Sequence, residues 1–132
     1  MERPIEKLKP KLLVVDDDHM ILRLTGSIFS DQYDVHMAGD VDEAKAVITK
    51  HGPMPVLSDF RYPVGGLPAL LKWIREHENE HVRKIPITGM TGEDKKKLAE
   101  LAQQHGIPTI GKPFDVVELI DLVAQMYRPK TQ

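Results

Sequence analysis

Several features that would assign a chain of 132 residues to a functional class are missing from this sequence. There is no cysteine, which excludes disulfide bonds, thiolate metal ligands and a cysteine nucleophile. No apolar run approaches the roughly 18 residues of a membrane span, and residues 1–7 lack a signal-peptide core. The net charge is only −2, whereas domains that bind nucleic acid are usually strongly basic. We therefore expect a cytoplasmic protein that binds neither membranes nor nucleic acid directly.

The residues that are present suffice for one folded domain. Hydrophobic residues make up 41% of the chain and charged residues 29%, a balance that supports an apolar core and argues against general disorder. A chain of this length is close to the commonest size of a single domain. We predict a flexible, charged N-terminal tail over 1–10, a domain over 11–127 and a polar C-terminal tail over 128–132.

Strand-like and helix-like segments alternate five times along this domain. The apolar run 12–15 is typical of a strand buried on both faces, and further strands are predicted at 33–37, 55–58, 85–90 and 107–110. Asp40 and Asp115, each followed three residues later by glutamate, predict helix starts, and Glu93 and Asp94 are expected in the first turn of another helix. This alternation predicts an α/β fold, a (βα)5 doubly wound parallel sheet with helices on both faces, for which we expect the strand order 2-1-3-4-5.

Polar residues follow four of the five predicted strands. Asp16-Asp17-Asp18 follows the first strand, Asp59 the third, Thr91 the fourth and Lys112 the fifth. Ligands of open α/β sheets bind outside the carboxyl ends of the strands, so these side chains are expected to share one crevice. Clustered carboxylates repel one another unless a cation is present, and Mg²⁺ prefers such oxygen ligands. With a lysine and a hydroxyl beside it, the isolated Asp59 is the best candidate for a nucleophile in phosphoryl transfer.

Four motifs at these positions resemble the signature blocks of bacterial response-regulator receiver domains. They are VVDDD (14–18), LSDFRYP (57–63), PITGMT (86–91) and KPF (112–114), and the resemblance covers residues 11–127. It implies the flavodoxin-like receiver fold, and a phosphoryl group accepted on Asp59 from a histidine kinase or phosphotransfer protein. It also implies that the domain is a phosphoacceptor with slow self-dephosphorylation rather than an enzyme. Its output would be a downstream protein or a fused effector domain.

The resemblance also assigns roles to individual residues. Asp17, Asp59 and the backbone carbonyl of Arg61 would bind Mg²⁺ directly, whereas Asp16 would act mostly through water. Thr91 and Lys112 would contact the phosphoryl oxygens, and the peptide bond after Lys112 is expected to be cis. A homodimer through the face formed by the fourth helix, fifth strand and fifth helix is a further implication.

The sequence departs from the family pattern at several positions. Thr109 stands where the family usually has an aromatic residue that acts as a rotating switch, and a threonine has no ring to rotate. Glycine at positions 89 and 111 leaves two strands without a side chain at one position each, which we expect to weaken their packing. Arg61 and Glu93 flank the path of an attacking water, and we hypothesise that they pair over the site and slow hydrolysis.

Three other functions remain open at the level of sequence. A Mg²⁺-dependent phosphohydrolase usually has a second acid two residues after its nucleophile, where this chain has Arg61. A degenerate receiver that binds partners without phosphorylation would have lost acidic or lysine positions that are kept here. A flavodoxin-like cofactor binder would need a phosphate-binding loop after the first strand, which the sequence lacks.

Overall fold

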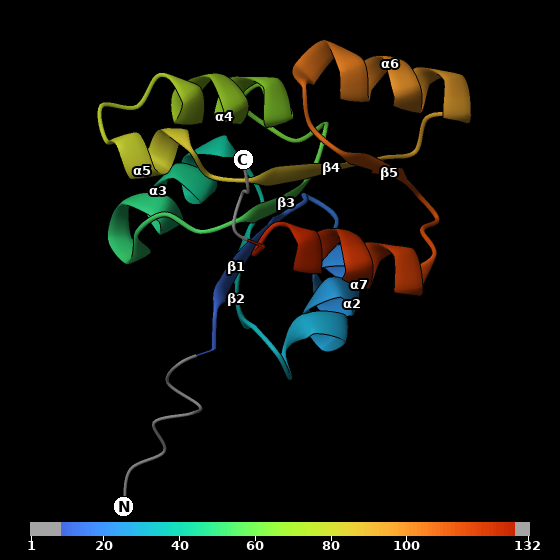
Figure 1. Cartoon of the computed structure of the whole chain (residues 1–132), viewed down its shortest axis with the longest axis horizontal. Helices are drawn as coiled ribbons and strands as arrows, with labels where there is room; N and C mark the ends of the chain where they lie inside the picture. The colour runs from blue at the N-terminus through green and yellow to red at the C-terminus, as the bar shows by residue number, and fades with distance from the viewer. Residues whose placement is uncertain (1–8, 129–132) are drawn as a thin grey trace, which may run out of the picture.

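Five parallel strands form one sheet with helices on both of its faces (Figure 1). The computed structural model describes residues 9–128, so the predicted tails lie almost entirely outside the described residues. The strands are β1 (Lys11–Val15), β2 (Asp34–Ala38), β3 (Val56–Asp59), β4 (Ile87–Thr91) and β5 (Thr109–Gly111). The helices are α2 (His19–Phe29), α3 (Val41–His51), α4 (Gly66–Arg75), α5 (Glu80–Arg83), α6 (Lys95–His105) and α7 (Val116–Gln125).

The strand order is β2-β1-β3-β4-β5, which confirms the predicted topology. Neighbouring strands pair in parallel throughout, for example Val15 beside Ser58 and Asp59 beside Met90. The carboxyl ends of β1, β3, β4 and β5 therefore lie next to one another along one edge of the sheet.

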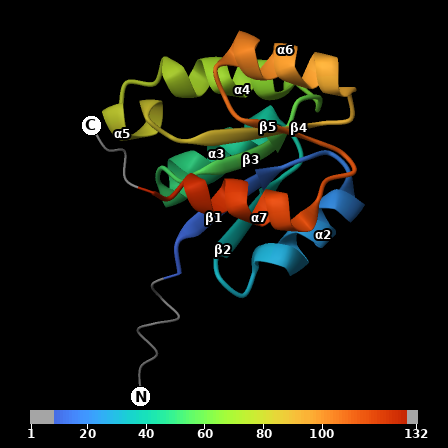
Figure 2. The same ribbon diagram turned by 45° about the vertical axis from the view of Figure 1, so that its right-hand side comes forward.

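Two apolar clusters, one on each face of the sheet, hold the layers together. In β1, Leu13 and Val15 belong to the cluster beneath α3 and α4, whereas Leu12 and Val14 belong to the cluster beneath α2 and α7. All four side chains are fully buried, as expected for a strand covered on both faces. The turned view in Figure 2 shows α2 and α7 on one side of the sheet and α4 and α6 on the other.

Aspartates begin four of the helices, because a carboxylate accepts hydrogen bonds from the free N–H groups of a first turn. Asp40 accepts from the N–H of Glu43 at 2.8 Å, and Asp115 from the N–H of Glu118 at 3.1 Å, as predicted. The prediction for α6 was wrong in detail. Asp94 is the residue that caps this helix, so Glu93 precedes the helix instead of lying in its first turn.

Two further features were not anticipated. The short helix α5 is an additional element between α4 and β4, capped by Asn79, whose side chain accepts from the N–H of His81. The turn before α4 bends sharply against the site: a Cβ on Gly66 would come within 2.4 Å of the Phe60 carbonyl oxygen, and φ is +65° there. Glycine is therefore required at position 66. None of the described helices has the length and apolar character needed to cross a membrane.

Candidate functional site

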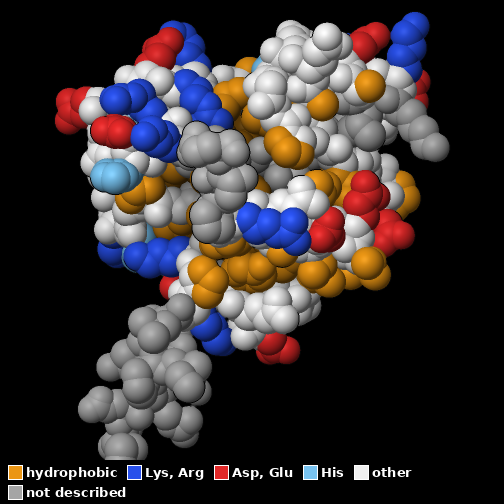
Figure 3. All heavy atoms as spheres, in the orientation of Figure 1, with side chains coloured by type: hydrophobic (Ala, Val, Ile, Leu, Met, Phe, Trp, Pro, Cys, Tyr) orange, Lys and Arg blue, Asp and Glu red, His pale blue; other side chains and the backbone are white. Residues whose placement is uncertain are grey.

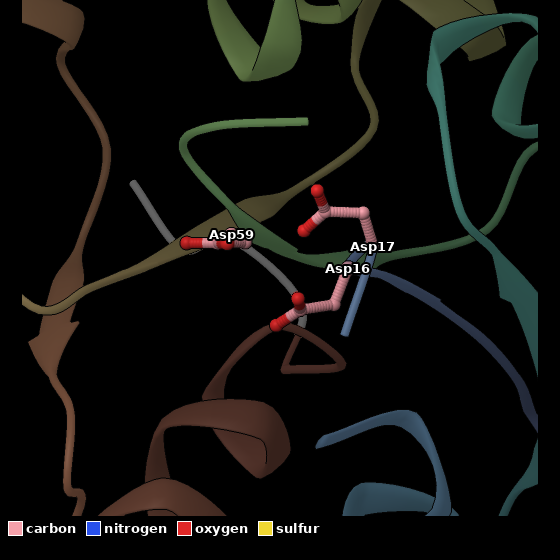
Figure 4. Close-up of side chains that lie close together, drawn as sticks. All are labelled: Asp16, Asp17 and Asp59. Atoms are coloured by element: carbon pink, nitrogen blue, oxygen red, sulfur yellow. The ribbon is translucent and has the colours of Figure 1, made fainter. Parts of the chain in front are cut away.

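Three carboxylates meet at the edge of the sheet where β1 and β3 end. Asp16 directly follows β1 and is fully buried, Asp17 is exposed, and Asp59 is the last residue of β3. Each of the three offers a carboxylate oxygen that lies within 4.8 Å of those of the other two. Figure 4 shows the three side chains gathered at this edge. The predicted convergence of these acids is thus present in the structure.

Lys112 joins this cluster from the end of β5. Its Nζ lies 2.9 Å from Oδ2 of Asp16 and 3.5 Å from Oδ2 of Asp59. Burial lowers the pKa of Lys112, but the hydrogen bond to Asp16 and the charges of both acids outweigh burial and raise it overall. The amine therefore stays charged. The peptide bond between Lys112 and Pro113 is cis, as the resemblance implied.

Asp59 has an unfavourable electrostatic environment. Burial and the nearby charge of Asp16 raise its pKa, although Lys112 and the N–H of Phe60, which donates to Oδ1 at 2.9 Å, act in the opposite direction. One amine thus offsets only part of the charge of three acids. Oxygen donors at this spacing match the preference of Mg²⁺, so the residues of the site fit this ion.

Thr91 ends β4, the strand beside β3, and is buried at the same edge. Its Oγ1 accepts a hydrogen bond from the N–H of Glu93 at 3.2 Å. The Thr91 carbonyl accepts from the N–H of Lys112 at 2.7 Å, which ties the ends of β4 and β5 together. Strand pairing thus places Thr91 at the end of the strand next to the one that ends in Asp59, and the Lys112 amine lies beside the carboxylates.

A family model described as the response regulator receiver domain matches residues 12–124. The chain belongs to this family. It is therefore a module of two-component signalling, which implies a kinase partner and an output under its control. Comparison with curated protein sequences gives no significant match.

Solved receiver structures have the same fold. The receiver domain of NtrX from Brucella abortus is 30% identical, with a TM-score of 0.74, and the match covers 87% of this chain and 96% of that chain. The chemotaxis response regulator CheY4 of Vibrio cholerae is 25% identical, with a TM-score of 0.77, and coverages of 89% and 98%. The signal receiver domain of an HD domain-containing protein from Pseudomonas fluorescens Pf-5 is 25% identical, with a TM-score of 0.75, and coverages of 89% and 94%.

The receiver domain contains the hypothesised ion pair between Arg61 and Glu93. Nη2 of Arg61 lies 3.0 Å from Oε2 of Glu93, which joins the loop after β3 to the turn after β4. The side chain of Arg61 is 83% exposed, so the pair contributes little to the stability of the fold. The pair links the two loops that follow β3 and β4, and this link is what the hypothesis about slowed hydrolysis requires.

Sequence reasoning missed a pair of buried hydroxyls behind Asp59. Ser58 is fully buried in β3, and its Oγ lies 2.9 Å from the hydroxyl of the buried Tyr62. Burial raises the pKa of Tyr62 far above its usual range, so its hydroxyl keeps its proton. The available signal was a hydroxyl-bearing aromatic residue at position 62, three positions after Asp59.

The glycine at 89 has a packing role in this receiver. A Cβ at this position would lie 2.5 Å from Cε2 of Phe60, so the phenyl ring fills the space that a side chain would need. The expected loss of packing is therefore compensated by Phe60. At position 109 the half-buried threonine donates from Oγ1 to the Ile107 carbonyl at 3.3 Å, which ties its hydroxyl to the segment just before β5.

Proposed function

We propose that Asp59 accepts a phosphoryl group from a histidine kinase or phosphotransfer protein in a Mg²⁺-dependent reaction. The observation that carries this proposal is the position of Asp59 at the end of a central strand, with the Lys112 amine 3.5 Å away and two further carboxylates beside it. An oxygen nucleophile, a fixed cation and a set of metal ligands are thus within reach of one incoming group.

Asp17, Asp59 and the carbonyl of Arg61 would hold Mg²⁺ directly. When bound, the ion would neutralise charge on the phosphoryl oxygens. Asp16 is fully buried and accepts the Lys112 hydrogen bond at 2.9 Å, which supports its assignment to a contact through water. The same hydrogen bond fixes the amine beside the carboxylates.

The transfer itself needs little covalent chemistry from the protein. A carboxylate oxygen of Asp59 attacks phosphorus as the bond from phosphorus to the donor nitrogen breaks, and the donor imidazole keeps the electron pair of that bond. Lys112 would donate to a phosphoryl oxygen. Thr91 would donate its hydroxyl hydrogen to another, because its Oγ1 already accepts from Glu93 and its own hydrogen is free for this bond.

The new charge at Asp59 would alter a protein-interaction surface on α6, β5 and α7. Apolar side chains on α7 are exposed there, with Val117 at 75% and Val116 at 44%, and Figure 3 shows apolar groups on the molecular surface between charged ones. This face would bind the downstream protein or fused effector domain, or a second copy of the domain. The output would depend on a backbone or helix shift, since Thr109 has no ring to rotate.

Acetyl phosphate tests the proposal without knowledge of the kinase. The full chain is incubated with acetyl phosphate in the presence and absence of Mg²⁺, and its intact mass is measured. One added phosphoryl group that needs Mg²⁺, is released by hydroxylamine and is absent in Asp59→Asn supports the proposal. Sustained hydrolysis of phosphate monoesters would instead indicate a phosphohydrolase, and no modification by any donor would indicate a degenerate receiver.

A further inference from the structure

Two buried hydroxyl groups are linked by hydrogen bonds to the backbone carbonyl of Asp59 and take no part in the proposed transfer. Tyr62 is 7% exposed and Ser58 is fully buried, so neither hydroxyl is supplied with partners by solvent. The Tyr62 hydroxyl lies 2.9 Å from Ser58 Oγ, and the Ser58 hydroxyl donates to the carbonyl of Asp59 at 2.7 Å. We call this arrangement the Ser58–Tyr62 clasp.

The direction of the two hydrogen bonds follows from the number of hydrogens. A serine hydroxyl has a single hydrogen, and that of Ser58 goes to the Asp59 carbonyl. The hydroxyl of Tyr62 must therefore be the donor to Ser58 Oγ. The clasp is a chain of two hydrogen bonds that runs from Tyr62 to the peptide group after Asp59, and bonds in such a chain strengthen one another.

The clasp holds one end of that peptide group, and the Asp59 side chain holds the other. The N–H of Phe60 donates to Oδ1 of Asp59 at 2.9 Å. The orientation of the peptide group and the orientation of the carboxylate are therefore linked. A rotation of this peptide group would break its bond to Ser58 and move the carboxylate that faces Lys112.

The same segment presents the carbonyl of Arg61. The preceding carbonyl, that of Phe60, accepts from the N–H of Leu67 at 3.1 Å. Within residues 9–128, no group donates a hydrogen bond to the carbonyl of Arg61. Both of its neighbours are fixed by hydrogen bonds, Phe60 through its carbonyl and Tyr62 through its hydroxyl. The Arg61 carbonyl is left as a backbone acceptor for another ligand.

We propose that Ser58 and Tyr62 are positioning residues, which hold the backbone at 59–61 so that the Asp59 carboxylate and the Arg61 carbonyl are ready to bind a divalent cation. This inference rests on the proposed function and deepens it. Groups that orient metal ligands raise affinity, since the ligands need not be ordered when the ion binds. Phenylalanine at 62 would keep the ring in the core and remove only the donor to Ser58.

The test is the dissociation constant of Mg²⁺ for the unphosphorylated full chain, measured by titration calorimetry. Tyr62→Phe is expected to raise this constant about fivefold, the effect of one lost hydrogen bond behind the ligands. Ser58→Ala should do the same, and the double variant should bind no more weakly than the weaker single variant. The Mg²⁺ concentration for half-maximal phosphorylation by acetyl phosphate should rise in parallel, with a smaller change in the maximal rate.

Tyr127→Phe is the matched control, because the hydroxyl of Tyr127 donates to the carbonyl of Lys11 at the opposite end of β1 from the carboxylates. It should lower the unfolding midpoint without changing the Mg²⁺ affinity. An equal rise in the dissociation constant for this control would show a general loss of stability and overturn the inference. Should Tyr62→Phe fail to fold, Ser58→Ala makes the same comparison with a smaller change.

The outcomes separate the inference from the proposed function. If the wild type binds Mg²⁺ and accepts one phosphoryl group while Tyr62→Phe and Ser58→Ala bind the ion with wild-type affinity, the clasp has no positioning role and the phosphoacceptor proposal stands. If the wild type neither binds Mg²⁺ nor accepts a phosphoryl group, the proposed function is wrong and the inference falls with it.

Discussion

Replacing Asp59 with asparagine is expected to stabilise the protein in the absence of Mg²⁺. Burial and the charge of Asp16 raise the pKa of Asp59, so its ionised form is disfavoured in the folded state. Asparagine has nearly the same shape and keeps an oxygen that can accept from the N–H of Phe60. The variant therefore loses the charge with little change in packing.

The magnitude follows from the distances. At an effective dielectric constant of about 20, each repulsion between carboxylates within 4.8 Å costs about 3 kcal/mol, and the attraction to Lys112 at 3.5 Å returns about 5 kcal/mol. Burial and repulsion by Asp16 together exceed that attraction, since the pKa of Asp59 is raised overall. We expect Asp59→Asn to be more stable by about 1–2 kcal/mol, or about 4–8 °C in unfolding midpoint.

The dependence on pH has a defined sign. Because the folded-state pKa of Asp59 is raised, its contribution to wild-type stability is present below the unfolded value of about 4 and is lost as pH rises through the folded pKa. The advantage of the variant should therefore be small below about pH 4 and reach its full size at neutral pH. Thermal unfolding in EDTA and in excess Mg²⁺ measures the difference in stability between Asp59→Asn and the wild type, and Mg²⁺ should reduce or reverse this difference. A variant less stable than the wild type in EDTA would refute this electrostatic account.

Three further predictions address the neighbouring residues. Lys112→Met should lower the free energy of unfolding of the metal-free protein by about 3 kcal/mol in chemical denaturation, because the buried Asp16 loses its partner. Unchanged stability would contradict the importance of that contact. Arg61→Ala removes the ion pair with Glu93 and should speed dephosphorylation about two- to fivefold, while the unfolding midpoint stays constant. An unaltered phosphoryl lifetime would show that the pair does not slow hydrolysis. Gly89→Ala should cost about 1–3 kcal/mol in unfolding free energy, since its methyl group would collide with the Phe60 ring, and a neutral effect would argue against that packing.

The elements that could be predicted from sequence are those with a strong local signal. The apolar run of β1 marks a strand buried on both faces, and Asp40 and Asp115 mark helix starts, because these patterns have direct physical causes. The convergence of the site was also predictable, since parallel strands bring their carboxyl ends to one edge and polar residues follow four of the five strands.

The remaining features depend on geometry that the local sequence does not specify. Glu93 and Asp94 are adjacent acids that could each cap a helix, and only the backbone path after Thr91 selects Asp94. The Ser58–Tyr62 clasp depends on the turn after β3, which returns the tyrosine ring to the strand that it has just left. The packing of Phe60 against the glycine at 89 likewise joins the residue that follows β3 to the middle of β4, which is distant in the sequence.

The most direct test of the account is to locate the phosphoryl group. After treatment with acetyl phosphate and Mg²⁺, borohydride reduction converts a phosphorylated aspartate to homoserine, and peptide mass spectrometry identifies the position. The account predicts homoserine at position 59 alone, and none without Mg²⁺. Homoserine at position 16 or 17 instead, or at no position, would contradict it.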